Sequence, residues 1–387
     1  MATCTIPIPI TEAVLTAASV AEPSPGEQVW NSLTGYATGE KVILGAPTTT
    51  VTISNGAPAV VTWTANGLPN GTPVILSTAG ALPTGLTAGR IYYVVNRSAD
   101  AFQLAEVVGG APIATSSAGS GAHTAKASIH RTYQSVKLTT NTGNPPAIDD
   151  GTNWYDVGPT NLWSMIDLYR PSVTWGVSPM TFQLTPGQRI RSIFLGEMDA
   201  ETARVVVKVG GVTVYDVTSQ LWTRKTFTPT DFCFKPWTRR KDAQRIDLPL
   251  YSNPVIEVTL TKSTGQVGIG EVVIGNPEYM GKTQYGAKRP FKNFTKFDRR
   301  TDGTPNAPKR QRNVPTASMS IMFDKENTPN LLDLADRSNG LICVWSGIDD
   351  DAHSYFPAAL ILGLATTFEP DLSQPDHGLL TLVAEEY

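Results

Sequence analysis

The side chains of this chain best suited to acid–base or metal chemistry are its histidines and its clustered carboxylates. The histidines are His123, His130, His353 and His377. They lie in unrelated segments and show neither an HExxH motif nor another paired metal spacing. Asp349, Asp350 and Asp351 precede His353 and could offer oxygens to a hard cation, but no glycine-containing calcium loop accompanies them. We therefore expect a solvated loop there and no metal site.

Two pairs of carboxylates could serve a glycoside hydrolase if the fold held them at the required separation. One pair is Glu197 with Asp199 and the other is Asp298 with Asp302. Such enzymes need their two carboxyl groups roughly 5–10 Å apart. Sequence does not show that distance, and surface charge is the simpler explanation. We expect no catalytic residue here.

Other motifs for catalysis or cofactors are also missing from the sequence. It contains no GxxxxGK[ST] phosphate loop, no GxGxxG after a strand and no GxSxG elbow. Three widely separated cysteines, Cys4, Cys233 and Cys343, supply neither a disulfide framework nor a zinc knuckle. They are expected to be reduced and mostly buried. The sequence thus favours a protein that is not an enzyme and has no cofactor.

Aromatic residues gather around Gly, Asn and Asp turns in residues 30–42, 130–135 and 149–167. The candidates for a glycan-binding face are Trp30, Tyr36, Tyr133, Trp154 and Tyr155. Indole and phenol rings stack on the apolar faces of sugars and offer polar edges for hydrogen bonds. A small β-module can instead use these rings as its core or in an interface, and we favour that role for any single ring. The cluster indicates a binding or assembly protein.

A basic and aromatic segment begins near residue 282. Residues 282–300 and 308–312 hold ten Lys or Arg against one Asp. The candidate contact residues are Lys288, Arg289, Phe291, Lys292, Phe294, Arg299, Arg300, Lys309 and Arg310. This composition could form a groove for single-stranded nucleic acid. Because the rest of the chain offers no nucleic-acid module, we favour an extended arm that docks on an acidic neighbouring subunit.

Composition favours β structure and excludes some partners. The chain has 387 residues, of which 41% are hydrophobic and 17% charged, as in folded proteins with several domains. Its 33 glycines and 29 prolines favour short strands and turns. A net charge of −3 gives no general attraction to nucleic acid or acidic membranes. The N-terminus lacks the basic region of a signal peptide, and the longest apolar run is about half a membrane span. We expect synthesis in a cytoplasm and no membrane insertion.

The expected fold class is mainly β and multidomain. Residues 1–44 and 128–167 would form a small aromatic β-module, with an N-terminal helix over residues 11–18. Residues 45–127 would form a small inserted β domain, with strands near residues 61–64, 72–77, 90–96 and 101–105.

The second half of the chain predicts two further domains. Residues 168–278 would form a β-sandwich containing strands at 254–261 and 266–275 and a hairpin of residues 204–209 and 212–217 joined by Gly-Gly. Residues 279–387 would combine the basic arm with an α+β domain. Its elements are a strand at 316–323, a helix starting at Thr328 and strands at 341–346, 358–365 and 378–384 in one sheet.

Several motifs together carry a family resemblance. WNSLTGYATGEKV, HRTYQSV, NTGNPP and NWYDVGPTN resemble the chitin-binding-type modules of carbohydrate-active enzymes. The longer TNWYDVGPTNLWSMID resembles a version of this module in tail proteins of long-tailed bacteriophages. The insert over residues 66–105 and the segment EYMGKTQYGA are similar to parts of phage tail and baseplate proteins. The large insertion and the Gly-Pro-Thr-Asn stretch depart from sugar-binding modules.

The resemblance implies a structural component of a virion tail tip or baseplate with a carbohydrate-binding-like module. Its partners would be further copies of itself, in a ring or trimer, and other tail proteins. The virion would be its location, after synthesis in the host bacterial cytoplasm. An alternative is a receptor-binding tail protein that recognises host-surface polysaccharide. A glycan-degrading enzyme is a third and less favoured reading.

Overall fold

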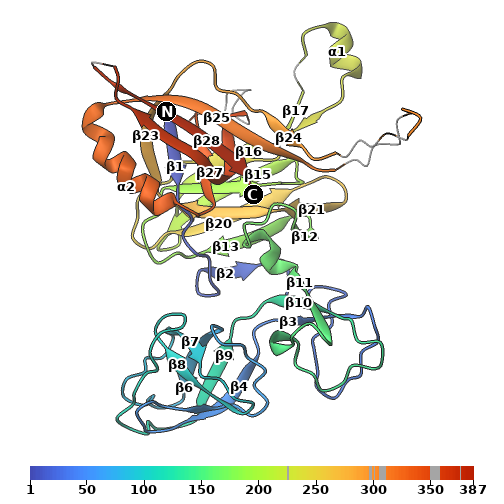
Figure 1. Cartoon of the computed structure of the whole chain (residues 1–387), viewed down its shortest axis with the longest axis vertical. Coiled ribbons are helices and arrows are strands. Elements are labelled where there is room, and N and C mark those ends of the chain that lie inside the picture. Colours follow the sequence, from blue (N-terminus) through green and yellow to red (C-terminus); the bar gives the residue numbers. More distant parts are fainter. Residues whose placement is uncertain (225, 296–298, 300, 305–310, 349–357, 375) are drawn as a thin grey trace. The chain divides into compact units, whose positions relative to one another are not determined.

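The computed structural model describes residues 1–387 except residues 225, 296–298, 300, 305–310, 349–357 and 375. Strands greatly outnumber helices, which confirms the mainly β, multidomain fold class (Figure 1). The chain divides into two compact units. Unit 1 contains Met1–Val20 and Ser164–Tyr387, and unit 2 contains Ala21–Trp163.

The inserted segment of unit 2 is a closed six-stranded barrel with the strand order β4-β5-β8-β7-β6-β9. Its strands are β4 (Thr48–Ile53), β5 (Val61–Thr62), β6 (Pro73–Thr78), β7 (Ile91–Val95), β8 (Ala101–Ala105) and β9 (His123–Ala127). Four of them confirm the strands expected within the insert. Alternate residues such as Val74, Leu76, Tyr92 and Val94 point inward and form the core, because successive strand residues face opposite sides. Closure leaves this small domain without an exposed sheet edge.

The rest of unit 2 is the aromatic module. Its sheet has the order β11-β10-β3, formed by β3 (Lys41–Leu44), β10 (Arg131–Ser135) and β11 (Trp154–Pro159). The 3₁₀ helix η1 (Pro146–Ile148) lies between β10 and β11, and the 3₁₀ helix η2 (Leu162–Met165) follows β11 where the chain passes from unit 2 to unit 1. Strands from both sides of the insert therefore pair in one sheet, so the barrel is an excursion between β3 and β10.

Unit 1 contains a five-stranded sheet with the order β16-β15-β20-β13-β2. Its strands are β2 (Leu15–Ala18), β13 (Met180–Leu184), β15 (Thr202–Val209), β16 (Val212–Gln220) and β20 (Val255–Thr261). The β15–β16 hairpin confirms the predicted Gly-Gly turn, since Gly210 and Gly211 have φ values of 56° and 83°. Smaller sheets are β19-β14-β22, formed by β14 (Ser192–Gly196), β19 (Ala243–Arg245) and β22 (Glu271–Gly275), and the pair β12 (Thr174–Val177) with β21 (Gln266–Ile269).

Two sequence expectations for these sheets were wrong. Instead of a helix over residues 11–18, the chain makes one turn, in which Val14 N and Leu15 N donate to Thr11 O, and then pairs as β2 with β13. Tertiary pairing overrides the local helical spacing. The expected strand at residues 266–275 divides into β21 and β22, because the two halves pair with β12 and β14 respectively.

The C-terminal part of unit 1 is a seven-stranded sheet with the order β23-β1-β26-β27-β28-β25-β24. Its strands are β1 (Ala2–Thr5), β23 (Pro277–Thr283), β24 (Phe291–Asn293), β25 (Asn313–Phe323), β26 (Cys343–Ser346), β27 (Leu360–Asp371) and β28 (Gly378–Glu386). The turn η3 (Lys325–Asn327) leads into the helix α2 (Thr328–Ser338), whose Leu331 and Leu334 join the sheet's core. The predicted strands and helix of this region are confirmed.

The N-terminal residues belong to this sheet and not to the aromatic module, which corrects the expected grouping of residues 1–44. β1 pairs with β23 on one side and β26 on the other, and Ala2 and Cys4 are fully buried in its core. Sequence could not show this because the partners of β1 lie more than 270 residues away in the chain. The β-sandwich region and the C-terminal sheet fall within the same compact unit.

Candidate interaction surfaces

The predicted aromatic site is brought together by β3, β10 and β11. The cluster consists of Tyr36, Val42, Tyr133 and Trp154, with Trp30 packed against it. Tyr36 and Trp154 meet edge to face with ring centroids 5.4 Å apart. The indole Nε1 of Trp154 donates to Asn144 O at 2.9 Å, and the Tyr36 hydroxyl accepts from Asn31 N at 2.7 Å. The polar edges that a sugar would require are already used inside the protein.

Burial removes three of the five predicted glycan contacts. Tyr36, Tyr133 and Trp154 are 1%, 7% and 2% exposed, so their faces cannot meet a sugar from solvent. The glycan-binding prediction is wrong for these three, and the core role that we favoured for single rings describes them. Burial, reinforced by the Asp156 carboxylate, raises the pKa of Tyr133 to about 12.

Trp30 and Tyr155 retain exposure. Tyr155 is 64% exposed, because it is the residue after Trp154 on β11 and so faces the other side of the strand. Trp30 is half-buried against the cluster. A single fully available ring is much less than a stacking platform.

The acidic turn before Trp154 has an architectural role. Oδ2 of Asp149 accepts from the backbone N–H groups of Gly151, Asn153 and Trp154 at 3.0, 2.9 and 2.9 Å. Oδ1 accepts from the Asn153 amide at 2.6 Å. Partial burial opposes ionisation, but these bonds outweigh it and lower the pKa of Asp149. One carboxylate thus fixes the loop that delivers Trp154 into the cluster.

His130 also serves packing within the module. Its Nδ1 lies 2.6 Å from Oε2 of Glu22, and both side chains are nearly buried. Its ring stacks on Trp163 with centroids 4.0 Å apart. The Thr160 hydroxyl donates to Oε1 of Glu22 at 2.6 Å. Glu22 therefore ties the chain before β3 to the residue that precedes β10 and to the residue that follows β11.

The predicted basic arm is partly folded against its own sheet. Phe291, Lys292 and Asn293 form β24, which pairs with β25. Lys292 forms an ion pair with Glu385, and Arg289 Nη1 donates to Leu360 O at 3.1 Å. Strand pairing, the Glu385 carboxylate and the Leu360 carbonyl thus hold these residues on their own sheet, and contact of the arm with a neighbouring subunit stays a prediction.

The other arm residues have local backbone contacts, keep exposed rings or lie outside the described residues. Lys288 exchanges backbone hydrogen bonds with Ser318, and Arg299 Nη1 donates to Gly303 O at 3.1 Å. Phe291 and Phe294 are 63% and 52% exposed. Arg300, Lys309 and Arg310 lie outside the described residues. Among the described residues of the arm, the exposed rings that could meet a neighbour are therefore those of Phe291 and Phe294.

A second projecting segment, which sequence reasoning did not single out, comprises residues 222–239 and is called the protrusion below. It begins at β17 (Trp222–Thr223), contains α1 (Pro229–Phe234) and ends at β18 (Thr238–Arg239). β17 and β18 pair at its base, and α1 stands away from the sheets of unit 1 (Figure 1). No residue of α1 is buried. The protrusion thus has order without a core of its own.

Local interactions give the protrusion its shape. Thr228 caps α1 by accepting from Asp231 N at 3.1 Å, and Oδ2 of Asp231 accepts from Phe227 N at 3.0 Å, as in a capping box. The Arg224 guanidinium lies over the rings of Phe232 and Trp237, 5.4 and 4.8 Å from their centroids. The Thr-Pro-Thr-Asp sequence and the density of rings and cations were the available sequence signals. These signals lie within residues 168–278, for which the sequence predicted a β-sandwich, and so they did not indicate a separate segment.

A buried ionic cluster lies elsewhere in unit 1, centred on Arg170. Its acidic members are Glu197, Asp242, Glu271 and Glu386, which come from the chain near β14, β19, β22 and β28. Nη2 of Arg170 donates to both oxygens of Asp242 at 2.8 and 2.9 Å. Although burial opposes it, these carboxylates raise the pKa of Arg170. The cluster connects the seven-stranded sheet with the β19-β14-β22 sheet.

Glu271 is the least satisfied member of the cluster. It is fully buried, and neither carboxyl oxygen has a hydrogen-bond partner among the described residues. Its Oε1 lies 4.0 Å from Arg170 Nε, and a Cβ at Gly196 would collide with its Oε2. Burial raises the pKa of Glu271 to about 8 against the opposing charge of Arg170. A neutral Glu271 is therefore favoured at pH values below about 8.

Cations hold one of the two carboxylate pairs considered for glycoside hydrolysis, Glu197 with Asp199. Glu197 pairs with Arg170 and with Lys241, whose Nζ is 2.7 Å from Oε2. Asp199 pairs with Arg239 and Lys262 at 2.7 and 2.9 Å. Asp298, like the 349–351 carboxylates and His353, lies outside the described residues. These contacts are those of structural ion pairs.

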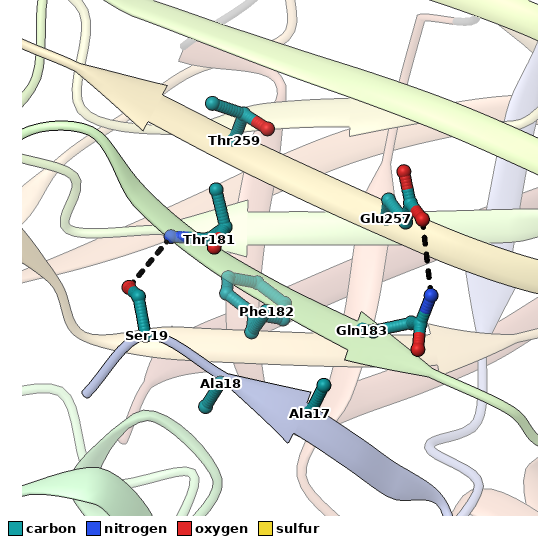
Figure 2. Close-up of a pocket in the computed structure, with 8 residues that line it drawn as sticks. All are labelled: Ala17, Ala18, Ser19, Thr181, Phe182, Gln183, Glu257 and Thr259. Carbon is teal, nitrogen blue, oxygen red and sulfur yellow. Dashed lines mark hydrogen bonds between the residues drawn. The ribbon is translucent and has the colours of Figure 1, made fainter. Parts of the chain in front are cut away.

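A shallow groove of about 360 Å³ lies along the edge of the five-stranded sheet (Figure 2). Its lining residues are Ala17, Ala18, Ser19, Thr181, Phe182, Gln183, Glu257 and Thr259. Glu257 accepts from Gln183 Nε2 at 3.0 Å and lies 2.7 Å from Lys208 Nζ. This carboxylate is engaged, so the groove offers no acid–base pair.

Across the described part of the chain, no group of three or more His, Cys, Asp or Glu side chains is placed to hold a metal ion. None of its helices has the length and apolar character to cross a membrane. Cys4 and Cys343 are buried and Cys233 is exposed on α1, all as free thiols. The thiols thus differ from the expected buried set only at the protrusion.

The fold and these surfaces define a β-rich, multidomain protein with two exposed aromatic and basic segments. No family model and no curated protein matches the chain. One solved structure, a GH78 family rhamnosidase of Bacillus sp. GL1, aligns at 14% identity and a TM-score of 0.17 over 69% of this chain and 36% of that chain. The alignment thus spans about a third of the rhamnosidase, and a similarity of this size carries no argument about function.

Proposed function

We propose that the protein is a structural component of a bacteriophage tail tip or baseplate, which assembles with itself and contacts other tail proteins. The observation that carries the proposal is the exposure of large apolar side chains on the protrusion and around β24. Phe227, Phe234, Phe291 and Phe294 are 81%, 82%, 63% and 52% exposed. Large exposed apolar side chains with charged neighbours are typical of protein–protein interaction sites.

The sequence motifs supply the phage assignment. The resemblance of the aromatic module, the insert and residues 278–287 to parts of tail proteins indicates the kind of assembly in which these surfaces would be used. The proposed role is non-enzymatic. It is supported by the cations that pair with Glu197 and Asp199, since carboxylates held this way are typical of structural ion pairs.

Glycan recognition at a host surface is the alternative reading, and burial of Tyr36, Tyr133 and Trp154 weakens it. Tyr155 is exposed and could still stack on a sugar, so glycan binding can be tested at this ring. Under either reading the chain would reside in the virion after synthesis in the host cytoplasm.

The test is to place an epitope tag on the chain in a phage that carries the gene and to locate the tag by immunoelectron microscopy. We expect label at the tail tip or baseplate. As a control for antibody access, the same tag is placed on a protein inside the capsid, where intact particles should show no label. Intact particles without tail label, from cells that produce the tagged chain, would contradict the proposal.

A further inference from the structure

The protrusion exposes a cluster of large aromatic side chains. Phe227, Phe232, Phe234 and Trp237 are 81%, 65%, 82% and 56% exposed, and Trp222 at the base is 37% exposed. Each such ring can bury about 150–250 Å². Together they could supply a large part of the roughly 800 Å² that each partner buries in a stable protein interface. Exposing this much apolar surface to water is unfavourable, which indicates that a partner covers the protrusion.

The cations beside the rings limit which class of partner could bind the protrusion. Arg224 covers Phe232 and Trp237, and Lys235 Nζ lies 5.1 Å from the centroid of Phe227. Insertion of these rings into a lipid bilayer would carry the Arg224 guanidinium toward hydrocarbon, which is unfavourable. Stacking of nucleic-acid bases uses free ring faces, and a cation already lies near the ring in three of these residues, Phe227, Phe232 and Trp237. Arg beside Trp and Phe is instead typical of the energetic centre of protein interfaces.

Charge is distributed very unevenly along the chain. Residues 222–239 and 282–312 hold 14 of the 31 Lys and Arg but only 3 of the 34 Asp and Glu, so the remaining residues carry 17 basic against 31 acidic side chains. The base of the protrusion already uses this complementarity within the chain, where Arg239 pairs with Asp199. Outside these two segments a second copy of the chain thus carries an excess of acidic residues, which complements the charge of a basic, aromatic tip.

We propose that the protrusion of one copy docks on the acidic surface of a second copy in a head-to-tail contact. The proposal deepens the assembly role given above and rests on it. Two protrusions facing each other would bring like charges together, which disfavours a symmetric tip-to-tip dimer. A head-to-tail contact repeats from copy to copy and generates a ring where the rotation closes.

Phe234→Asp is the most direct test, because Phe234 is 82% exposed and the change adds a negative charge at the tip. Leu138→Asp is the matched control: Leu138 is 94% exposed and lies in unit 2. Self-association of the full chain would be measured by sedimentation velocity over a wide concentration range. We expect Phe234→Asp to weaken it at least about tenfold and Leu138→Asp to leave it unchanged. Raising salt from about 0.05 M to about 0.5 M should weaken association of the wild-type chain.

Cys233 gives an independent readout of contact geometry, since it is exposed on α1 while Cys4 and Cys343 are buried. Its reaction with a maleimide dye should slow at least about tenfold when the wild-type chain is associated. In Phe234→Asp it should stay at the rate of the monomer. Under mild oxidation, efficient formation of a dimer linked through Cys233 would show tip-to-tip contact and would overturn the head-to-tail proposal.

The remaining outcomes separate this inference from the proposed function. Wild-type association that Phe234→Asp leaves intact would overturn the inference alone and direct attention to residues 294–312. A wild-type chain that stays monomeric overturns the inference, while tail label in the phage experiment would still support the proposed function. If monomers bind phosphatidylglycerol vesicles and Phe234→Asp abolishes that binding, the inference is overturned. The partner of the protrusion would then be an anionic membrane and not a second copy of the chain.

Discussion

The three central rings of the aromatic module are at most 7% exposed, whereas the three phenylalanines of the protrusion are at least 65% exposed. The two regions are similarly rich in aromatic residues and in turns. In the module, β3, β10 and β11 form a sheet whose inward positions gather the rings. In the protrusion, β17 and β18 pair with each other, and no residue of α1 is buried. Ring density alone therefore does not distinguish a core from a contact surface.

The polar atoms of the rings show the same difference. The N–H of Trp154 and the hydroxyl of Tyr36 have backbone partners inside the module. The protrusion uses phenylalanines at its most exposed positions, which make no such demand, and it covers ring faces with Arg224 and Lys235. A satisfied interior is typical of a role in stability, and an open apolar surface is typical of a role in recognition.

The largest expected effect is that of truncating Trp154 in the module, compared with truncating Phe234 in the protrusion. Trp154→Ala should reduce the free energy of unfolding of unit 2 by about 3–5 kcal/mol, because it leaves a cavity and an unpaired Asn144 carbonyl. Phe234→Ala should change stability by less than about 0.5 kcal/mol, since the ring is exposed. Urea unfolding followed by near-ultraviolet circular dichroism measures both. Equal losses for the two variants would abolish the distinction between core and contact surface.

A smaller effect tests the contrast between satisfied and unsatisfied buried groups. The pKa of Glu271 is raised from its ordinary 4.5 to about 8 in the folded protein. A raised carboxyl pKa gives stability that is fully present below the ordinary value and is lost as pH rises through about 8. The free energy of unfolding of unit 1 should therefore fall by a few kcal/mol between about pH 5 and pH 8. Calorimetry across this range measures it.

Glu271→Gln supplies the control for that pH dependence, because an amide of the same shape stays neutral. We expect a flatter pH profile and a more stable unit 1 at pH 8. Some slope should persist, since burial also raises the pKa of Glu386, while Arg170, Glu197 and Asp242 face the same site. Parallel profiles for the variant and the wild type would show that Glu271 does not hold the proton.

Local patterns were sufficient to predict much of this fold. Gly210 and Gly211 predicted their hairpin because a two-residue turn needs positive φ, and Thr328 with Pro329 predicted the start of α2. Alternating strands in the insert and in the C-terminal sheet also appear where expected. In each case the determinant lies within a few residues, so the sequence carries it directly.

What the sequence could not show depends on distant partners. Residues 15–18 have helical spacing, yet their hydrogen bonds go to β13, more than 160 residues away. Arg170 collects carboxylates as far away as Glu386, and no local spacing indicates that they meet. The exposure of Phe234 depends on the lack of any element packed over α1 in the described part of unit 1.

A smaller loss is expected from the turn that positions Trp154. Asp149→Ala removes the acceptor of three backbone N–H groups and should destabilise unit 2 by about 1–3 kcal/mol. Asp150→Ala is the matched control, because Asp150 is exposed and its carboxylate accepts from Thr152 without reaching Trp154. Urea unfolding should rank the two variants in this order. A harmless Asp149→Ala would mean that the core of the module, and not its turn, positions the indole.

The smallest effect is expected at Tyr155, which keeps an exposed ring on the module. Tyr155→Ala should change stability by less than about 0.5 kcal/mol. A single stacking ring contributes about 0.5–1.5 kcal/mol, well short of the roughly 4 kcal/mol that even a millimolar complex needs. We therefore expect no saturable binding of chitin oligomers or bacterial surface polysaccharide by titration calorimetry. Binding by the wild-type chain that Tyr155→Ala abolishes would place a recognition surface on β11 as well. The contrast between a buried module and an exposed protrusion would then be one of degree, because both regions would present rings to a partner.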